Sequence, residues 1–376
     1  MLVSQTASVV RKCAAEGDSI AAELFELIRC PYDHSNLERV GRDRLRCASG
    51  HVFPVIQAVP VLLRPEQRFT LWVAKASWDL ANAWVDGRDQ KDRWFVGTLG
   101  LSEEERVALS RKLRDPNQDN IDPVIGYMMG ATAGNLFKKV GLTLTTVPLP
   151  IFPMEPSPGR LLDIGCNWGR WTIAAAKAGF PSVGIDPSLG AVLAAQRLAR
   201  RLGADCEFVC GDGRFLPLGT RSFSRVFSYS VVQHLSEPDA CACLNEIYRV
   251  LEPGGISLVQ MPNAFGVRSF YHLIRRRFRK PANFDVCYWR PRKLIRVFKK
   301  AIGPSTLLID GFFGLGVTSC ELGKLPLKAK CVLLSSQLLK RSAKILPFLK
   351  HFADSLYVRS ILVSESNIEK PTPQQQ

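Results

Sequence analysis

Three aspartates that each close an apolar segment carry the clearest chemical signal in the sequence. Asp186 follows Asp163 by 23 residues, and Asp212 comes after the next apolar segment. A carboxylate at the second of these positions is suited to accept hydrogen bonds from the hydroxyls of a ribose. An acidic side chain at the third position can accept a hydrogen bond from the exocyclic amine of an adenine. The pattern therefore predicts a site for a ligand that contains a nucleoside.

A glycine turn follows the first of these aspartates. Gly165 and Gly169 bracket Cys166, Asn167 and Trp168, and glycines allow both a sharp turn and a close approach of a ligand to the backbone. A dinucleotide-binding dehydrogenase would require the spacing G-x-G-x-x-G at this point. The chain has G-C-N-W-G instead, which disfavours that class of enzyme. An acidic residue just before the turn also suits a cationic sulfonium better than a pyrophosphate, which binds bare helix amides.

Short apolar segments alternate with helical ones over residues 158–262, which is typical of a parallel sheet built from βαβ units. Strands are expected at Arg160–Ile164, Ser182–Asp186, Cys206–Cys210, Ser224–Ser230, Gly255–Met261, Thr306–Asp310 and Ser355–Val363. Helices are expected at Trp171–Ala178, Leu189–Leu202, Ala240–Val250 and Arg292–Ala301. The predicted fold is therefore α/β, a Rossmann-like, doubly wound sheet of seven strands.

The segments around these aspartates resemble the motifs of the class I S-adenosylmethionine-dependent methyltransferases, in particular those with a type 11-like domain. LLDIGCNWG is similar to their first motif, GIDPS to the second, GDGRFLPL to the third and FSRVFSYSVVQHL to the fourth. EIYRVLEPGGISLVQMPN is similar to the segment that contains their fifth strand. The resemblance covers residues 158–262 closely and the chain to about residue 365 loosely. It implies S-adenosyl-L-methionine as the cofactor.

The resemblance also implies the residues that hold this cofactor. Asp163 and the glycine turn would border its methionine part, Asp186 would hold the ribose, and Asp212 would lie at the adenine. One departure is Asn167, which stands where the family often has a glycine. The full set of cofactor-binding candidates is Asp163, Gly165, Cys166, Asn167, Gly169, Asp186, Asp212, Gly213, Arg214 and Ser230.

Methyl transfer from a sulfonium is an in-line displacement, so a base is needed only where the acceptor carries a proton. His234 follows the fourth predicted strand, and similar methyltransferases that act on hydroxyls often have a histidine near this point. We therefore predict His234 as the general base; a histidine that only bonds the backbone at a helix start is the alternative. Tyr229 and Gln233 lie near the same strand end and are candidates for orienting an acceptor.

Two clusters of candidate metal ligands lie near the N-terminus. Cys30 is followed by Asp33 and His34, and Cys47 is followed by His51, a pattern typical of a small zinc ribbon. The segment LIRCPYDHSNLERVGRDRLRCASGHVFPVIQAVPVLL resembles the zinc-ribbon-like module of the activator subunit of transfer-RNA methyltransferases. The first cluster has only one cysteine, so Asp33 or His34 would complete the ligands; a module that packs without zinc is the alternative.

The net charge of +16 arises in one part of the chain, because residues 264–350 contain 19 Lys or Arg and 3 Asp or Glu. The segments FGVRSFYHLIRRRFRK and CVLLSSQLLKRSAKILPFLK interleave apolar and basic residues there. This pattern fits helices that lie in the interface of an anionic membrane. Lid helices with buried apolar faces are the alternative.

The predicted organisation is a ribbon-like module at 1–64, a helical segment and Pro-rich linker at 65–157, a methyltransferase domain at 158–365 with basic insertions at 264–284 and 311–353, and a disordered tail at 366–376.

These observations predict a methyltransferase for a small-molecule or lipid-linked acceptor. An RNA base methyltransferase and a non-catalytic scaffold that binds a partner are the alternatives, and the oligomeric state stays open. The first residues lack the apolar segment of a signal peptide, and no stretch reaches the roughly 18 apolar residues of a membrane span. The eleven cysteines are therefore expected to be reduced thiols in a cytoplasmic protein, with peripheral attachment to a membrane.

Overall fold

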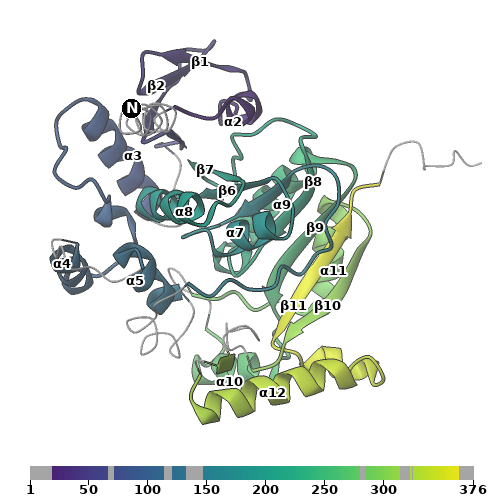
Figure 1. The fold of residues 1–376 in the computed structure, drawn as a ribbon. Coiled ribbons are helices and arrows are strands. Elements are labelled where there is room, and N and C mark those ends of the chain that lie inside the picture. Colours follow the sequence, from purple (N-terminus) through teal and green to yellow (C-terminus); the bar gives the residue numbers. More distant parts are fainter. Residues whose placement is uncertain are drawn as a thin grey trace, which may run out of the picture. The chain divides into compact units, whose positions relative to one another are not determined.

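The computed structural model describes residues 19–66, 72–113, 121–132, 147–279, 285–313, 322–323 and 325–363 (Figure 1). The chain divides into two compact units. The predicted tail lies outside the described residues. None of the helices that the structure describes combines the length and apolar character needed to cross a bilayer. The first unit comprises residues 1–156, 163–219 and 316–330, and the second comprises 157–162, 220–315 and 331–376.

The first unit contains a mixed sheet with the strand order β1-β2-β3-β4-β7-β6-β5. β7 pairs in parallel with both β4 and β6, whereas β1 to β4 pair consecutively in antiparallel fashion. The last two residues of β5 belong to this unit and its first two to the other. The strands are β1 (Leu37–Val40), β2 (Arg44–Cys47), β3 (Val52–Ile56), β4 (Val59–Leu62), β5 (Leu161–Ile164), β6 (Ser182–Asp186) and β7 (Cys206–Gly211).

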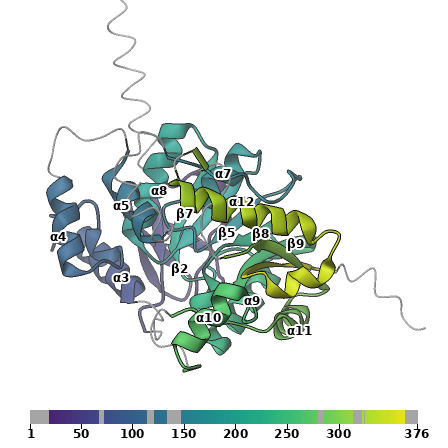
Figure 2. The same ribbon diagram turned by 90° about the horizontal axis from the view of Figure 1, so that it is seen from below.

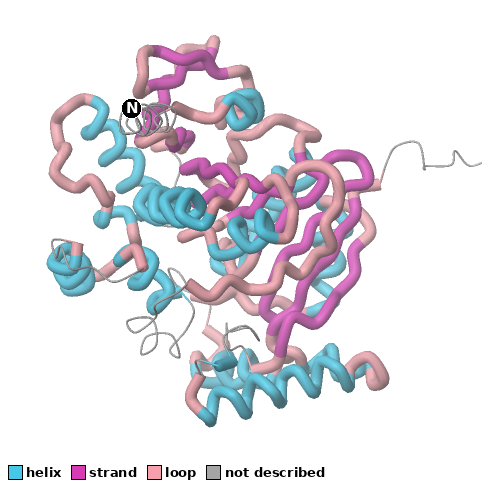
Figure 3. The backbone as a smooth tube through the Cα atoms, viewed as in Figure 1, coloured by secondary structure: helices cyan, strands magenta, loops and turns pink. Residues whose placement is uncertain are grey.

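The helices of the first unit show how local sequence signals set their ends. α8 has the predicted bounds because Ser188 caps its first turn, accepting a hydrogen bond from the Ala191 amide, and Gly203 ends it with a φ of 57°. α7 and α8 pack on β6 and β7 (Figure 3). The described helical segments are α2 (Ala22–Leu27), α3 (Trp72–Val85), η1 (Val96–Thr98), α4 (Glu103–Lys112), α5 (Pro123–Thr132), α7 (Arg170–Lys177) and α8 (Leu189–Leu202).

The second unit has the strand order β8-β9-β11-β10. β8 and β9 are parallel, and β11 is antiparallel to both of its neighbours. Its strands are β8 (Phe223–Ser228), β9 (Leu251–Pro262), β10 (Ser305–Gly311) and β11 (Ser355–Ile361). Its helical segments, seen from below in Figure 2, are η3 (Val232–His234), α9 (Glu237–Val250), α10 (Val267–Arg275), α11 (Pro291–Ala301), α12 (Leu327–Ser342) and η5 (Pro347–Phe352). The part of α12 that belongs to this unit starts at residue 331.

The α/β, Rossmann-like fold and the seven predicted strands are confirmed, with ends within four residues of those expected. The predicted count of seven strands for the sheet is not confirmed, because the described residues form eleven, and the four others lie in the N-terminal region. β4 pairs in parallel with β7, with Val61 opposite Cys210, and so covers an edge whose amides and carbonyls would otherwise lack partners. The ribbon-like assignment of the N-terminal strands stays a prediction.

Candidate functional site

Asp163 lies inside β5 and is almost fully buried, at 1% exposure. Its Oδ2 accepts a hydrogen bond from the Thr172 hydroxyl of α7 at 2.7 Å. Burial, together with the neighbouring charge of Asp186, raises the pKa of this carboxyl to about 7. Asp163 therefore connects β5 to α7 beneath the glycine turn, and its carboxyl is not freely exposed to a ligand.

Asp186 ends β6 with its carboxylate between two backbone donors. Its Oδ2 accepts from the Asn167 amide at 3.0 Å, and its Oδ1 accepts from the Ser188 amide at 2.9 Å. Burial raises the pKa of Asp186 to about 6, although both amides stabilise the ionised form. Each oxygen keeps a further lone pair, so the carboxylate is oriented by the two amides and can still accept a hydrogen bond from a ribose hydroxyl.

The turn between β5 and α7 explains why asparagine can replace the expected glycine. Asn167 has a φ of 48°, in the left-handed region that asparagine tolerates better than most residues. Gly169 has a φ of 81°, and a Cβ there would lie 2.9 Å from the Ala195 Cβ, so glycine is required. Trp168 is 3% exposed and packs inside the unit, so it does not obstruct the turn; Cys166 is also buried.

The loop after β7 differs from the sequence expectation. Arg214 forms a bidentate ion pair with Asp212, with Nη2 2.6 Å from Oδ2 and Nε 3.1 Å from each oxygen, and its own amide also donates to Oδ1. Both side chains are largely buried. Asp212 is thus already engaged by a cation, and an adenine amine would have to share its oxygens with Arg214.

Residues of the N-terminal segment, on either side of its strands, hold this loop. Sequence reasoning missed these contacts. The Arg64 guanidinium lies between two rings, 4.8 Å from the centre of Tyr32 and 4.4 Å from the centre of Phe215. The Arg29 amide donates to the Pro217 carbonyl at 2.8 Å, and the Gly219 amide donates to the Leu27 carbonyl at 2.9 Å. The loop that carries Asp212 is therefore fixed by segments far away in the sequence.

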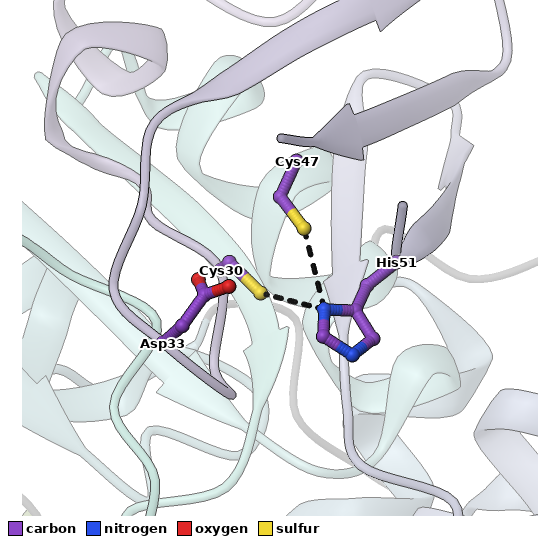
Figure 4. A group of neighbouring side chains, drawn as sticks. All are labelled: Cys30, Asp33, Cys47 and His51. Atoms are coloured by element: carbon purple, nitrogen blue, oxygen red, sulfur yellow. Dashed lines mark hydrogen bonds between the residues drawn. The ribbon is translucent and has the colours of Figure 1, made fainter. Parts of the chain in front are cut away.

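Four predicted metal ligands converge in the first unit (Figure 4). The His51 Nδ1 lies 3.3 Å from the Cys47 Sγ and 3.6 Å from the Cys30 Sγ. Asp33 is the fourth member, and the ligand atoms of all four lie within 4.8 Å of one another. His34, the other candidate in the first cluster, is not part of the group.

The donor set fits a tetrahedral zinc ion. Zinc bonds of about 2.3 Å to sulfur and 2.0 Å to nitrogen place such donors roughly 3.5 Å apart, close to the separations between His51 and the two cysteines. Asp33 is oriented by hydrogen bonds from Ser35 and Ser49, which lower the pKa of its carboxyl. The His51 ring stacks on Tyr32 with centroids 4.1 Å apart, which fixes the direction of Nδ1.

The second unit contains a polar network at the carboxyl end of β8. The Tyr229 hydroxyl donates to the Asp310 Oδ2 at 3.0 Å, and the Ser355 hydroxyl donates to the same oxygen at 2.6 Å. Gln260 donates to Ser355 at 2.7 Å and accepts from the Ser230 amide at 2.8 Å. Ser230 lies two residues beyond β8, with a φ of 61°. Of this network, Asp310, Ser355 and Gln260 were not predicted.

His234 and Gln233 lie in η3, directly after this network. The Gln233 Nε2 lies 2.6 Å from the Ser230 hydroxyl oxygen and 3.1 Å from the His234 Nε2. The Gln233 carbonyl accepts from the Cys287 amide at 2.7 Å. The structure therefore brings the predicted acceptor-side residues Tyr229, Gln233 and His234 together within the second unit. Of the ten cofactor candidates, Ser230 lies in this unit and the other nine lie in the first.

Comparisons with known proteins identify the central part of the chain. Residues 161–255 match the family model described as a methyltransferase domain. The chain is 36% identical over 107 residues to 24-methylenesterol C-methyltransferase 2 of Oryza sativa subsp. japonica, a match that covers 27% of the chain and 29% of that protein. It is 32% identical over 118 residues to a ubiquinone biosynthesis O-methyltransferase of Azorhizobium caulinodans, which covers 31% and 46%.

Among solved structures, the chain is similar to Haemonchus contortus phosphoethanolamine N-methyltransferase 2 in complex with S-adenosyl-L-methionine. The sequence identity is 20%, the TM-score is 0.36, and the match covers 57% of this chain and 50% of that one. The similarity to a methyltransferase domain lies in residues 161–255. The chain spans less than half the length of the two curated relatives.

A first prediction concerns the metal ligands. The protein should bind one zinc ion, and Cys47→Ser should lose it because the remaining donors cannot complete a tetrahedral site. His34→Ala is the matched control and should keep its zinc. The zinc content of the dialysed variants, measured by plasma mass spectrometry, checks this. Zinc lost equally from both variants would show that His34 is a ligand, and zinc retained in Cys47→Ser would refute the site.

A second prediction follows from the buried carboxyl of Asp163. Its folded-state pKa of about 7 lies above the ordinary value of 3.8, so the folded protein keeps a proton that the unfolded chain releases, and its stability falls as pH rises between these values. Asp163→Asn removes this titration and keeps an acceptor for Thr172. The free energy of unfolding in urea should therefore shift in favour of the variant from pH 5 to pH 8. A difference that does not change with pH would contradict this.

Proposed function

We propose that the protein transfers a methyl group from S-adenosyl-L-methionine to a small-molecule or lipid-linked acceptor. The observation that carries this proposal is the pair of buried carboxyls at adjacent strand ends, Asp163 and Asp186. Asp186 carries negative charge beneath the glycine turn, because two backbone amides stabilise its ionised form, and a cationic sulfonium is attracted to such a charge. The pyrophosphate of a nicotinamide cofactor would be repelled by it.

The two curated relatives support the same proposal for the acceptor. Their names give a sterol and a ubiquinone precursor pathway as the context of methylation, and both contexts involve small, apolar molecules. In the second unit, the Tyr229–Asp310–Ser355 network supplies polar groups that can orient an acceptor. His234 is the proposed base for an acceptor that carries a proton, because its Nε2 lies 3.1 Å from Gln233, which contacts Ser230 of the same network.

We propose a structural role for zinc at Cys30, Asp33, Cys47 and His51. Bound zinc would cross-link strands that have a small core of their own. A row of ring contacts connects these ligands to the loop that holds Asp212. Tyr32 stacks on His51, and Arg64 lies on Tyr32 and on Phe215 of that loop.

The cofactor assignment predicts a selective binding result. Calorimetric titration with S-adenosylhomocysteine should show micromolar binding, and NADH should show none. Asp186→Asn should weaken the binding by about tenfold, because a charged hydrogen bond to the ribose contributes roughly 1.5 kcal/mol. The control Asp205→Asn changes an exposed carboxylate just before β7 and should bind like the wild type. Binding of NADH, or unchanged binding by Asp186→Asn, would overturn the assignment.

The proposed base predicts a separation of chemistry from binding. His234→Gln should reduce methyl transfer by about a hundredfold, the usual contribution of a general base, while its affinity for S-adenosylhomocysteine stays unchanged. Incorporation of a labelled methyl group into a lipid extract measures the first quantity, and calorimetry measures the second. An equal loss of both would show that His234 supports the structure instead.

A further inference from the structure

The amphipathic helix α10 exposes the face that such helices normally bury. Its apolar side chains follow at intervals of three or four residues, and each is 47–58% exposed: Val267, Phe270, Tyr271 and Ile274. Phe278 continues the stripe at 63% exposure, and Ser269 is the buried residue of the helix. The predicted alternative, a lid helix with a buried apolar face, is therefore not the arrangement that the described residues of α10 adopt.

This orientation is imposed by specific contacts at the start of the helix. The Asp354 Oδ1 accepts hydrogen bonds from the amides of Arg268 and Ser269, at 2.7 and 2.9 Å. A Cβ at Gly266 would lie 2.4 Å from the Asp354 Cα, so the chain enters α10 in close contact with the segment before β11. The carboxylate caps the helix and fixes its rotation, which keeps the apolar stripe outward.

A second apolar surface lies on α12 and the segment that follows it. Leu334 and Leu338 are 50% and 65% exposed on α12, and Ile345, Phe348 and Phe352 are 50–83% exposed beyond it. α12 is itself held to β10, since the Ser336 hydroxyl accepts from the Phe312 amide at 2.9 Å. Both helices lie at the end of the second unit where β9 ends and β11 begins (Figures 1 and 2).

Exposed basic side chains lie on the same segments as both apolar surfaces. They are Arg268, Arg275, Arg277 and Arg279 on and after α10, and Lys340, Arg341, Lys344 and Lys350 on and after α12. The only acidic residues between 264 and 350 are Asp285, Asp310 and Glu321. Exposed apolar side chains with cations on the same segments, and little compensating negative charge, match the interface of an anionic bilayer, where acyl chains lie beneath negative headgroups.

We propose that α10, α12 and the segment to Phe352 form a docking face for an anionic lipid bilayer. The face adjoins the candidate acceptor residues of the same unit, because the Arg276 guanidinium at the end of α10 donates to the Val286 carbonyl at 3.3 Å, and the next amide, that of Cys287, donates to the Gln233 carbonyl in η3. Docking would bring a lipid-linked acceptor from the bilayer to Tyr229 and His234; this consequence, though not the docking itself, rests on the proposed function.

Co-sedimentation with vesicles tests the docking face. The full-length protein should bind vesicles that contain phosphatidylglycerol much more tightly than vesicles of phosphatidylcholine alone. The triple variant Phe270→Ser, Ile274→Ser, Phe278→Ser should bind at least ~10-fold more weakly, since it removes three exposed apolar anchors. Arg275→Glu with Arg279→Glu should lose the preference for phosphatidylglycerol. Trp72→Ser, which removes an exposed aromatic of α3, is the control and should bind like the wild type.

Three results would overturn the proposal: no binding to phosphatidylglycerol vesicles, equal binding by the triple variant, or a dimer in light scattering that the triple variant alone dissolves. The last would show that a second copy of the chain covers the face. The substituted side chains are exposed, and unchanged thermal unfolding of the variants confirms that they fold. The vesicle assay needs no cofactor, so its failure leaves the titration with S-adenosylhomocysteine as a separate test.

Discussion

Burying two carboxylates side by side is the constraint around which the first unit is built. Desolvation disfavours the charged forms of Asp163 and Asp186 and raises both pKa values, so each carboxylate must find donors nearby. Those donors are the Thr172 hydroxyl on α7 and the amides of Asn167 and Ser188. Because Ser188 also caps α8, satisfying the two carboxylates fixes where the turn bends and where α8 begins.

The same unit shows why four strands precede the methyltransferase domain in the chain. β4 covers the edge of β7, and residues 27–29 pair with residues 217–219. The loop between these contacts carries Asp212 and Phe215, and the Arg64 guanidinium lies on the Phe215 ring. Backbone pairing and the Arg64 guanidinium, which lies on Tyr32 and Phe215, therefore hold the loop that carries Asp212, the residue proposed for the nucleoside side of the cofactor.

The second unit separates two kinds of chemistry at one end of its sheet. Tyr229, Asp310, Ser355 and Gln260 satisfy one another in a hydrogen-bonded network. Asp354, nearby in the chain, instead uses its carboxylate to cap α10 and to turn that helix outward. A largely half-buried polar network thus lies in the same unit as an exposed apolar and basic surface, the arrangement that the proposed uptake of a hydrophobic molecule from a lipid phase would use.

The sequence by itself determined the seven strands after residue 158, the bounds of α8, the three aspartates near strand ends and the five candidate metal ligands, because these depend on periodicity, capping and turn residues close together in the chain. Tertiary structure alone decided that Asp33 rather than His34 joins the cysteines, that Arg214 engages Asp212, and that the apolar stripe of α10 faces outward. Each of these outcomes depends on a partner from another segment: Ser49 for Asp33, Arg64 for the loop of Arg214, and Asp354 for α10. A local pattern specifies that a helix has an apolar side, but only the contacts that fix its rotation decide which side meets the solvent.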